Sequence, residues 1–459
     1  MKHSFAGQSD CLKLTCQVSE EKIMKKRILM IISLILAMLS LLTACNTAQS
    51  GGDVTEGSDT GAAETTPADP DPLLVNNINI TDYTVVYDAR ASIGTEAAYK
   101  HFASKLKAAY KLEAPTSTSV TDTYQILIGV AGSNADIAAF YSNCTEGMIG
   151  FDGKSIYLLA KDNQGLYSVI DTFFSKIVEG EEYDTITVTS NESVALTTES
   201  IKVMSYNVLY DLTDRDVNEV AEFIKSQNAD VFGTQETMDE HKAAILATMT
   251  DYDCYTGVKL KGGSNMQNMI FWNKTKFKAV SKGFQYLTDT PFVESKIPES
   301  NSYRGFSYVV LESLETHKQF MFVNVHLTYR NAAGETNDDG ARWKQAKYLK
   351  QFLEGSKYET MPIVLVGDFN SVPSSQTLTL MENTKRMDRA AWVAKQKGDL
   401  EGTIAVSERT KRDTKYAFDH IFVTSDRITV SYFTAVDKRN ASGTYYSDHL
   451  PVVADIVIY

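Results

Sequence analysis

The sequence has few cysteines, and their placement argues against most cysteine chemistry. The 459 residues include five cysteines and no Cys-x-x-Cys pair, so a zinc site made of thiolates is not indicated. Cys11, Cys16 and Cys45 lie near the beginning of the chain, which leaves Cys144 and Cys254 for the folded regions. A disulfide between these two is one alternative, and two free buried thiols, which we expect, are the other.

The beginning of the chain lacks an apolar run long enough for a membrane span. Met24–Arg27 is basic, Ile28–Leu42 is apolar, and Leu42-Thr43-Ala44-Cys45 follows. The apolar run has about fifteen residues, whereas a spanning helix needs roughly twenty. Residues 1–45 are therefore typical of a secretory signal, with an uncleaved membrane helix as the alternative. The ending resembles a bacterial lipobox, which implies a true start at Met24, lipidation of Cys45, and anchoring to the bacterial cell membrane outside the cytoplasm.

Residues 46–72 contain almost no large apolar side chain. Their Gly, Ser, Thr, Ala, Asp and Pro cannot bury enough surface to offset the entropy of ordering, so we expect a flexible tether. Residues 73–198 are predicted to form a small mixed α/β domain, with helices at 96–109 and 166–177 and a hairpin turning at Asp152-Gly153. This order resembles accessory domains of bacterial glycan-processing enzymes. No catalytic constellation is visible there, so we expect a spacer or a binding module, with a cell-surface glycan as candidate partner.

The chain also lacks net basic charge. Its formal net charge is −13, most of which lies in residues 46–200, while 201–459 are nearly neutral. Binding to a long duplex depends mainly on Lys and Arg neutralising phosphates. The composition therefore argues against a tight or processive nuclease, although a local basic groove stays compatible with it.

The C-terminal part contains a set of short polar motifs next to strand-like apolar runs. In chain order they are Ser205-Tyr206-Asn207, Gln235-Glu236, Asn324-Val325-His326, Gly367-Asp368-Phe369-Asn370, Asp419-His420 and Ser447-Asp448-His449. Residues at strand ends can meet on one rim of a sheet although they are far apart in sequence. Carboxylates, amides and two histidines gathered there could hold a divalent cation and a phosphate together.

The order and identity of these motifs resemble the endonuclease/exonuclease/phosphatase superfamily, the deoxyribonuclease I-like fold, over residues 199–459. A single motif of this kind would more often be a turn, and the specificity comes from six in the family's order. The resemblance implies an α/β fold, a four-layer α/β sandwich of two packed β-sheets flanked by helices. The small α/β accessory domain would precede it.

The resemblance also implies a metal site and a phosphate site. Glu236 would be the principal ligand of Mg²⁺, with Mn²⁺ as the alternative ion, and Asn207 and Asp448 would complete or flank it. Arg304, just before an apolar strand, would bind the substrate phosphate.

Five further residues would be catalytic by the same resemblance. Asp368 would position or deprotonate the attacking water, Asn370 would donate to a phosphoryl oxygen, and Asp419 would orient His449. Two versions stay open: the Asp419–His449 pair takes the proton from water, or Asp368 does while His326 and His449 stabilise the transition state. In both, water attacks phosphorus in line and no covalent intermediate forms.

One stretch departs from the family pattern. Residues 264–268 lack the glutamate that members often carry before the next strand and that pairs with the first histidine. Gln267 or Asn268 could hold His326 through an amide oxygen, with weaker support for an imidazolium. We expect a changed substrate preference or a slower enzyme.

The sequence therefore predicts a secreted, membrane-anchored, Mg²⁺-dependent hydrolase that cleaves a phosphodiester. The candidate substrates are a small diester, a phospholipid headgroup or DNA. Two alternatives remain, an extracellular DNase and a glycan- or surface-binding lipoprotein whose catalytic domain is inactive.

Overall fold

The computed structural model describes residues 72–87, 93–120, 124–130, 146–213, 215–260, 267–335, 339–355, 358, 360–384 and 386–459. The chain divides into two compact units, Met1–Ala68 and Asp69–Tyr459, and all described residues belong to the second. Three predicted features lie outside the described residues: the signal segment with Cys45, nearly all of the tether, and Cys144. Within the described ranges no helix is long and apolar enough to cross a membrane. Cys254 is a free, half-buried thiol.

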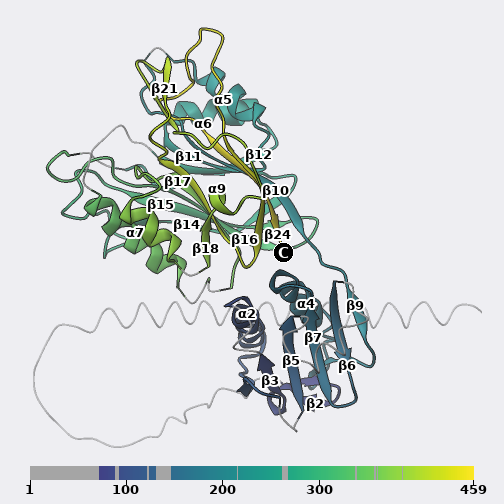
Figure 1. Cartoon of the computed structure of the whole chain (residues 1–459). Coiled ribbons are helices and arrows are strands. Elements are labelled where there is room, and N and C mark those ends of the chain that lie inside the picture. The colour runs from purple at the N-terminus through teal and green to yellow at the C-terminus, as the bar shows by residue number, and fades with distance from the viewer. Residues whose placement is uncertain are drawn as a thin grey trace, which may run out of the picture. The chain divides into compact units, whose positions relative to one another are not determined.

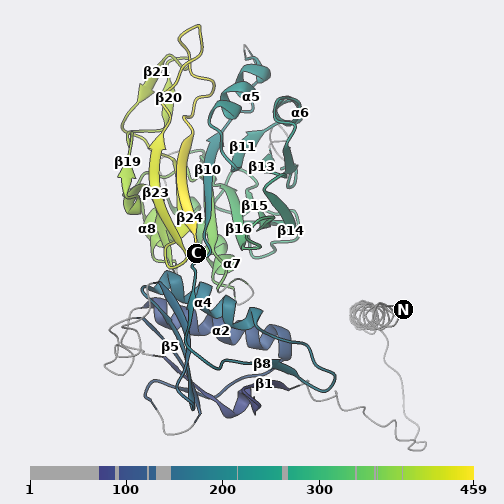
Figure 2. The ribbon, with the colours of Figure 1, turned by 90° about the vertical axis from the view of Figure 1, so that its right-hand side faces the viewer.

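The first part of the second unit is a small α/β module. Its strands and helices are β1 (Leu73–Val75), β2 (Ile78–Asn79), η1 (Ile80–Asp82), β3 (Thr84–Tyr87), α2 (Ile93–Tyr110), β4 (Thr116–Ser117), β5 (Gln125–Val130), β6 (Gly147–Phe151), β7 (Ser155–Ala160), α4 (Asn163–Ser175), β8 (Asp184–Ile186) and β9 (Glu192–Val194). They form a sheet in the order β4-β3-β5-β7-β6-β9 and a smaller one in the order β2-β1-β8. Both helices contribute to the module's apolar core (Figure 2).

The elements of this module confirm the two predicted helices and the predicted hairpin. The hairpin turns at Gly153, whose φ of +97° is a left-handed conformation that suits glycine. α4 begins after Asp162, whose carboxylate accepts a hydrogen bond from the Gly165 N–H at 2.8 Å. The division of the chain near residue 198 stays a prediction.

Two mixed sheets make up the rest of the unit. The first sheet has the order β12 (Tyr252–Tyr255), β13 (Gln267–Asn273), β11 (Val231–Thr237), β10 (Glu199–Asn207), β24 (Val452–Ile458), β23 (Ile428–Ala435) and β19 (Gln396–Lys397). The second has the order β14 (Phe277–Tyr286), β15 (Gly305–Ser313), β16 (Gln319–His326), β17 (Ile363–Asp368), β22 (Asp419–Thr424) and β18 (Met387–Arg389). β20 (Ile404–Val406) and β21 (Lys411–Asp413) form a separate ribbon. β10 and β24 run side by side in Figure 2, so the first and last strands of this region pair.

Helices cover the outer face of each sheet, as Figure 1 shows. These helices are α5 (Val217–Ser226), α6 (Asp239–Thr248), α7 (Gly340–Leu353) and α8 (Gln376–Glu382). A further short helix, α9 (Ala390–Val393), packs instead against the core between the sheets. In β10, Ile201 and Val203 point into the core between the sheets, while Met204 and Tyr206 pack under α5 and α6. In β16, Phe322 faces the core between the sheets and the alternate residues pack under α7 and α8.

These strands are buried on both faces, which explains why they appear in the sequence as continuous apolar runs. The predicted four-layer α/β sandwich is therefore confirmed.

The adjacent strands β16 and β17 are parallel and closely spaced. Their register pairs Val325 with Gly367 and His326 with Asp368. A Cβ atom added at Gly367 would lie 2.1 Å from the carbonyl oxygen of Val325, so only glycine allows this approach. The two strands therefore present His326 and Asp368 side by side at one rim.

The small module contacts the far end of the sandwich through α4. The Tyr167 hydroxyl donates to Asp426 at 2.6 Å, and the Gln164 amide donates to the Ser425 carbonyl at 3.2 Å. The guanidinium of Arg427 lies 3.9 Å from the centre of the Tyr167 ring. These contacts hold the turn between β22 and β23 against α4.

Candidate active site

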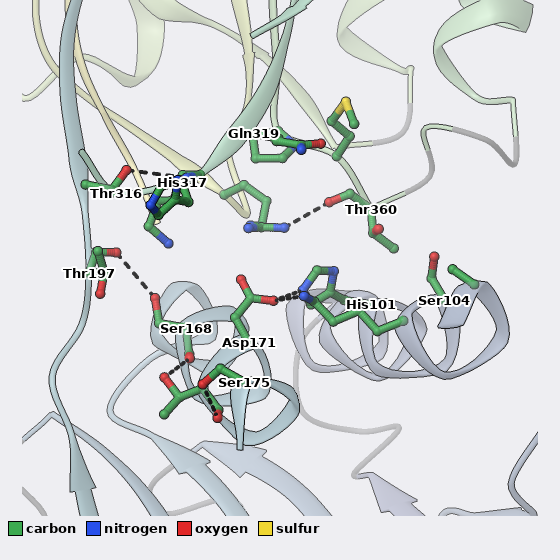
Figure 3. Close-up of a pocket in the computed structure, with 17 residues that line it drawn as sticks. His101, Ser104, Ser168, Asp171, Ser175, Thr197, Thr316, His317, Gln319 and Thr360 are labelled. Carbon is green, nitrogen blue, oxygen red and sulfur yellow. Dashed lines mark hydrogen bonds and ion pairs between the residues drawn. The ribbon is translucent and has the colours of Figure 1, made fainter. Parts of the chain in front are cut away.

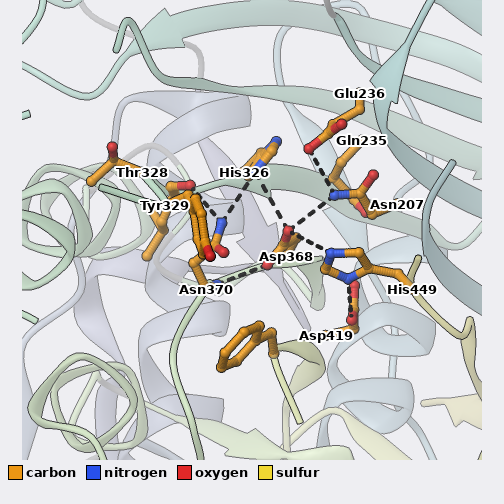
Figure 4. A network of polar contacts seen from close by, with 12 residues as sticks. Asn207, Gln235, Glu236, His326, Thr328, Tyr329, Asp368, Asn370, Asp419 and His449 are labelled. Atoms are coloured by element: carbon orange, nitrogen blue, oxygen red, sulfur yellow. Dashed lines mark hydrogen bonds and ion pairs between the residues drawn. The ribbon is translucent and has the colours of Figure 1, made fainter. Parts of the chain in front are cut away.

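The polar motifs meet where strands of both sheets end. Asn207 is the last residue of β10, and His326 and Asp368 are the last residues of the parallel strands β16 and β17. β22 is antiparallel to β17, so its first residue, Asp419, pairs with Asp368 at the same rim. His449 reaches the rim from the loop before β24. Figure 4 shows these side chains pointing toward one another.

Asp368 is the centre of the cluster and is almost completely buried. Its Oδ2 lies 3.0 Å from Asn207 Nδ2, 3.4 Å from His326 Nε2 and 3.6 Å from His449 Nε2. Burial raises the pKa of this carboxyl, the nearby His449 lowers it, and Asp419 raises it again, with a net upward shift. A carboxylate with an upward-shifted pKa between two imidazoles is equipped to exchange a proton near neutral pH.

Glu236 reaches the rim through an irregularity in β11. The register of β11 with β13 shifts between Thr234 and Thr237, and Glu236 has a φ of +56°, which non-glycine residues rarely adopt. Its Oε1 accepts from Asn207 Nδ2 at 3.2 Å and its Oε2 from the Tyr210 N–H at 3.2 Å. This conformation turns the carboxylate toward the cluster, where backbone strain commonly marks function.

Asn207 links the two carboxylates. Its amide nitrogen donates both to Glu236 and to Asp368, while its amide oxygen accepts from the Leu209 N–H at 3.0 Å. An amide ligates a hard cation through oxygen. In this orientation Asn207 therefore flanks the predicted metal position, and direct ligation would require its amide to turn.

Asp419 and His449 form a buried dyad. Asp419 Oδ2 lies 2.8 Å from His449 Nδ1 and accepts from the Thr403 hydroxyl at 2.6 Å. Burial lowers the pKa of His449, but Asp419 and Asp368 outweigh this and hold it well above its usual value. The dyad therefore fixes the ring orientation, the role that the resemblance implies for Asp419, and favours an imidazolium whose Nε2 faces Asp368.

His326 is positioned by Asn370 rather than by Gln267 or Asn268 at the start of β13. Asn370 Nδ2 lies 3.2 Å from His326 Nε2 and donates to the Leu327 carbonyl at 3.1 Å. The Gln267 amide instead donates to Asp239 at 3.3 Å and that of Asn268 to the Gly305 carbonyl at 2.8 Å.

The charge state of His326 follows from its surroundings. Its ring is buried, which lowers its pKa well below the usual value, as do Arg304 and His449. A neutral His326 is consistent with the absence of the family glutamate from residues 264–268.

Arg304 and Asp448 lie at the edge of the contact network. Arg304 is buried beside the carboxylates, and its Nε has no hydrogen-bond partner among the described residues. Burial lowers the pKa of its guanidinium, while Glu236 and Asp368 raise it. A buried guanidinium with an unused donor can bind a phosphate oxygen. Asp448 is half-buried and accepts from the neighbouring Ser447 hydroxyl at 3.2 Å.

The donors present suit a hard divalent cation. Glu236 Oε1 and Asp368 Oδ2 lie within 3.2 Å of the same amide nitrogen, so two carboxylates converge next to a half-exposed position. Asp368, Asp419 and His449 also place potential ligand atoms within 4.8 Å of one another. Asp419 and His449 are hydrogen-bonded to each other, however, so the oxygen-rich side at Glu236 is the better place for Mg²⁺.

Two positioning residues were missed by the sequence motifs. Thr403 bonds to Asp419 from an irregular stretch that carries no motif. Asp339 accepts from the Ser371 hydroxyl at 3.0 Å and from the Thr377 N–H at 2.9 Å, which ties the segment after Asn370 to α7. A lone aspartate in a polar loop gives no sequence signal for such a role. His420 packs beside Phe369, and its Nε2 lies 3.0 Å from the Ser371 carbonyl oxygen, away from the cluster.

Comparison with known proteins agrees with this geometry. A model of the endonuclease/exonuclease/phosphatase family matches residues 204–449. A family protein from Bacteroides thetaiotaomicron has 23% identity and a TM-score of 0.51, covering 57% of this chain and all of that one.

Two further structures are similar at the level of the fold. A mannosyl-6-phosphatase from Bacteroides thetaiotaomicron has 22% identity and a TM-score of 0.50, covering 56% of this chain and 99% of that one. An endonuclease/exonuclease/phosphatase from Bacteroides vulgatus has 20% identity and a TM-score of 0.51, covering 57% of this chain and all of that one. No curated protein sequence matches.

Proposed function

The chain belongs to the endonuclease/exonuclease/phosphatase family, and from this premise we propose that it is a metal-dependent hydrolase that cleaves a phosphodiester by in-line attack of water. The observation that carries the proposal is the position of Asp368. Its carboxylate touches both histidines and, through Asn207, is connected to Glu236. One carboxylate is thus adjacent to the groups for proton transfer and to those for metal binding.

In this proposal the side chains of the site have different roles in the reaction. Asp368 takes the proton from the attacking water, because its pKa is raised and its Oδ2 faces both imidazoles. His449, oriented by Asp419, donates to a phosphoryl oxygen. The Asn370 amide would do the same after releasing its contact with His326 or with the Leu327 carbonyl. Arg304 adds a fixed positive charge in a buried setting, where it is worth more than in water.

Glu236 would hold Mg²⁺ or Mn²⁺, with Asn207 and Asp448 beside it. The bound ion would neutralise the charge that develops on the phosphoryl group. Asn207 connects Asp368 to Glu236 by hydrogen bonds. Asp368 would still accept the proton from water in this arrangement.

A small diester or a phospholipid headgroup fits the nearly neutral catalytic region better than a long duplex does. The similar protein described as a mannosyl-6-phosphatase cleaves a sugar monoester by its name, so a monoester is the second candidate. Its likeness to this chain extends to the fold alone.

The first experiment compares hydrolysis of a chromogenic phosphodiester and of the matching monoester by the full chain with Mg²⁺. Glu236→Gln should lower the rate at least about 100-fold, because a ligand of the ion is lost. Glu240→Gln, an exposed carboxylate nearby, is the matched control and should leave the rate unchanged. A chelator should abolish turnover by the wild type.

Each result selects one function. Diester turnover that depends on Mg²⁺ and Glu236 supports the proposal, and a preference for the monoester selects a sugar-phosphate phosphatase. Cleavage of plasmid DNA that fades as salt rises selects the DNase. Equal inactivity of wild type and Glu236→Gln on all three would reject catalysis and favour a glycan-binding lipoprotein.

We also propose that the protein is exported and held at the bacterial membrane by a lipid on Cys45. Support comes from the basic segment, the short apolar run and the cysteine that ends them. Wild-type protein should partition into the detergent phase of cell extracts, whereas Cys45→Ser should stay in the aqueous phase. Identical partitioning of the two would reject the anchor.

A further inference from the structure

A polar cavity of about 800 Å³ lies far from the catalytic rim. Its walls come from α2 and α4 of the small module and from the chain segments at 316–319 and 360–362, as Figure 3 shows. A volume of this size is typical of sites for small ligands. The catalytic chemistry uses none of the residues that line it.

The cavity has a positive lining in a protein of net charge −13. Three cations line it, Lys105, Lys318 and Arg427, against one carboxylate, Asp171. That carboxylate is already occupied, since it lies 2.9 Å from Lys105 and 2.7 Å from His101 Nε2. Asp171 also acts on Lys318 and Arg427 from a distance, but the described contacts include no ion pair between it and either of them.

The environment of the Lys318 side chain gives the strongest indication that an anion binds in this cavity. It is half-buried, and its ammonium has no ion pair or hydrogen bond to any residue in the described part of the chain. Burial, followed by the charge of Arg427, lowers its pKa to about 8, so it is still mostly protonated at neutral pH. An ammonium group held in this way without a counter-ion is unfavourable unless an anion joins it.

Arg427 is held rigidly at the same cavity. It is 5% exposed, and it donates to the carbonyls of Thr360 at 2.9 Å and Tyr459 at 2.9 Å. Burial lowers its pKa, Asp171 and Asp426 raise it from a distance, and no side-chain carboxylate among the described residues forms an ion pair with it. The contacts with Thr360 and Tyr459 orient the guanidinium toward the cavity.

His101 offers a further unused atom. It is 9% exposed, and its Nδ1 has no hydrogen-bond partner among the residues that the structure describes, while Nε2 faces Asp171. Figure 3 shows His101 and Asp171 side by side on the helices that form the floor of the cavity. A buried polar atom without a partner indicates a bound group that would satisfy it.

The position separates this cavity from the catalytic centre. Gln319, at the start of β16, lines the cavity, and His326, at the end of β16, belongs to the catalytic cluster. Pro362 lines it directly before β17, which ends at Asp368. At about 3.3 Å per residue, the two sites are roughly 20 Å apart.

We propose that this cavity is a second, non-catalytic binding site for a phosphate group, carried either by free inorganic phosphate or by a phosphorylated sugar. Lys318 and Arg427 supply the charge. The hydroxyl side chains around them, among them Ser104, Thr197 and Thr360, suit phosphate oxygens and sugar hydroxyls. The cavity exceeds the size of a phosphate ion and leaves room for a sugar ring.

The test is calorimetric titration of the full-length protein in chelator, with inorganic phosphate and, separately, with glucose 6-phosphate. Lys318→Gln should weaken binding at this site by roughly tenfold or more, because it removes a charge-assisted contact. Lys318→Arg should retain most of the affinity. Lys276→Gln, which removes an equal charge from an exposed position paired with Asp230, should bind like the wild type.

The outcomes separate the sources of the phosphate. Tighter binding of glucose 6-phosphate than of inorganic phosphate identifies a sugar phosphate, and the reverse identifies the free ion. The proposal is overturned if neither ligand binds, or if Lys318→Gln binds both as tightly as the wild type does. Equal weakening by Lys276→Gln would also overturn it, since binding would then reflect overall charge. A melting temperature close to that of the wild type shows that Lys318→Gln is folded.

Discussion

Asp419 acts on the reaction through His449. Replacing it with asparagine keeps the shape but removes the charge that favours the imidazolium and allows the wrong tautomer. We expect Asp419→Asn to lower kcat by about 100-fold or more with little change in KM. Steady-state kinetics on the better of the two chromogenic esters measures both constants.

Asp388→Asn, an aspartate of β18 outside the cluster, is the control and should behave like the wild type. If Asp419→Asn keeps full kcat, the dyad has no part in the reaction and Asp368 alone handles the proton.

His241 makes the stability of the fold depend on pH. Its ring is buried in α6 and accepts from the Met238 N–H at 3.3 Å, and its Nε2 has no partner in the described part of the chain. Burial, with a smaller effect of Arg215, lowers its pKa to about 4 from an unfolded value of about 6.5. Its contribution to stability is therefore present above pH 6.5 and is lost as pH falls toward 4, because the unfolded chain binds the proton first.

Urea unfolding between pH 7 and pH 4 measures this loss. The wild type should lose up to about 3 kcal/mol more than His241→Gln over that range. His317→Gln, at an exposed position, should follow the wild-type curve. Parallel curves for the wild type and His241→Gln would show that the buried imidazole is not the cause.

At the scale of elements, Asp339 joins two helices to the segment that carries Asn370. It accepts from Ser371, from the backbone and hydroxyl of Thr377, and from Arg342 at 3.2 Å. Asp339→Asn exchanges acceptors for donors, so we expect a loss of about 1–3 kcal/mol in the free energy of unfolding and a lower kcat. Denaturant unfolding and kinetics test both effects, and a change in neither would show that the segment holds its position without this carboxylate.

The strands were predictable because they are buried on both faces and so form continuous apolar runs, as in β17. The gathering of the polar residues at one rim of the sheets was predictable, because each motif lies next to an apolar run that forms a strand. The contact between Asn370 and His326 was not predictable from the sequence. It depends on the left-handed backbone conformation of Asn370, with a φ of +49°, which no local sequence pattern indicates. Thr403 was equally unpredictable, because an irregular segment between β19 and β20 brings it to Asp419.

At the scale of the whole second unit, Tyr167 connects the small module to the sandwich. Tyr167→Phe removes the hydroxyl that donates to Asp426 and should cost about 1.5–3 kcal/mol, since the acceptor is charged. Tyr110→Phe is the matched control, because its hydroxyl donates to Asp184 at 2.8 Å within the small module.

Differential scanning calorimetry distinguishes the two variants. We expect Tyr167→Phe to separate the unfolding of the module from that of the sandwich, and Tyr110→Phe to lower only the transition of the module. A single unchanged transition in Tyr167→Phe would indicate that the contact contributes nothing to cooperativity.

Because β17 approaches β16 closely at Gly367, a substitution there could abolish catalysis without changing any charge. A single methyl group at this position would collide with the backbone next to His326 and push the histidine away from Asp368. Every ionisable side chain would still be present, so the electrostatic attraction for ligands at both sites would be preserved. Gly367→Ala would thus provide an inert receptor in which substrate capture can be observed over hours without turnover.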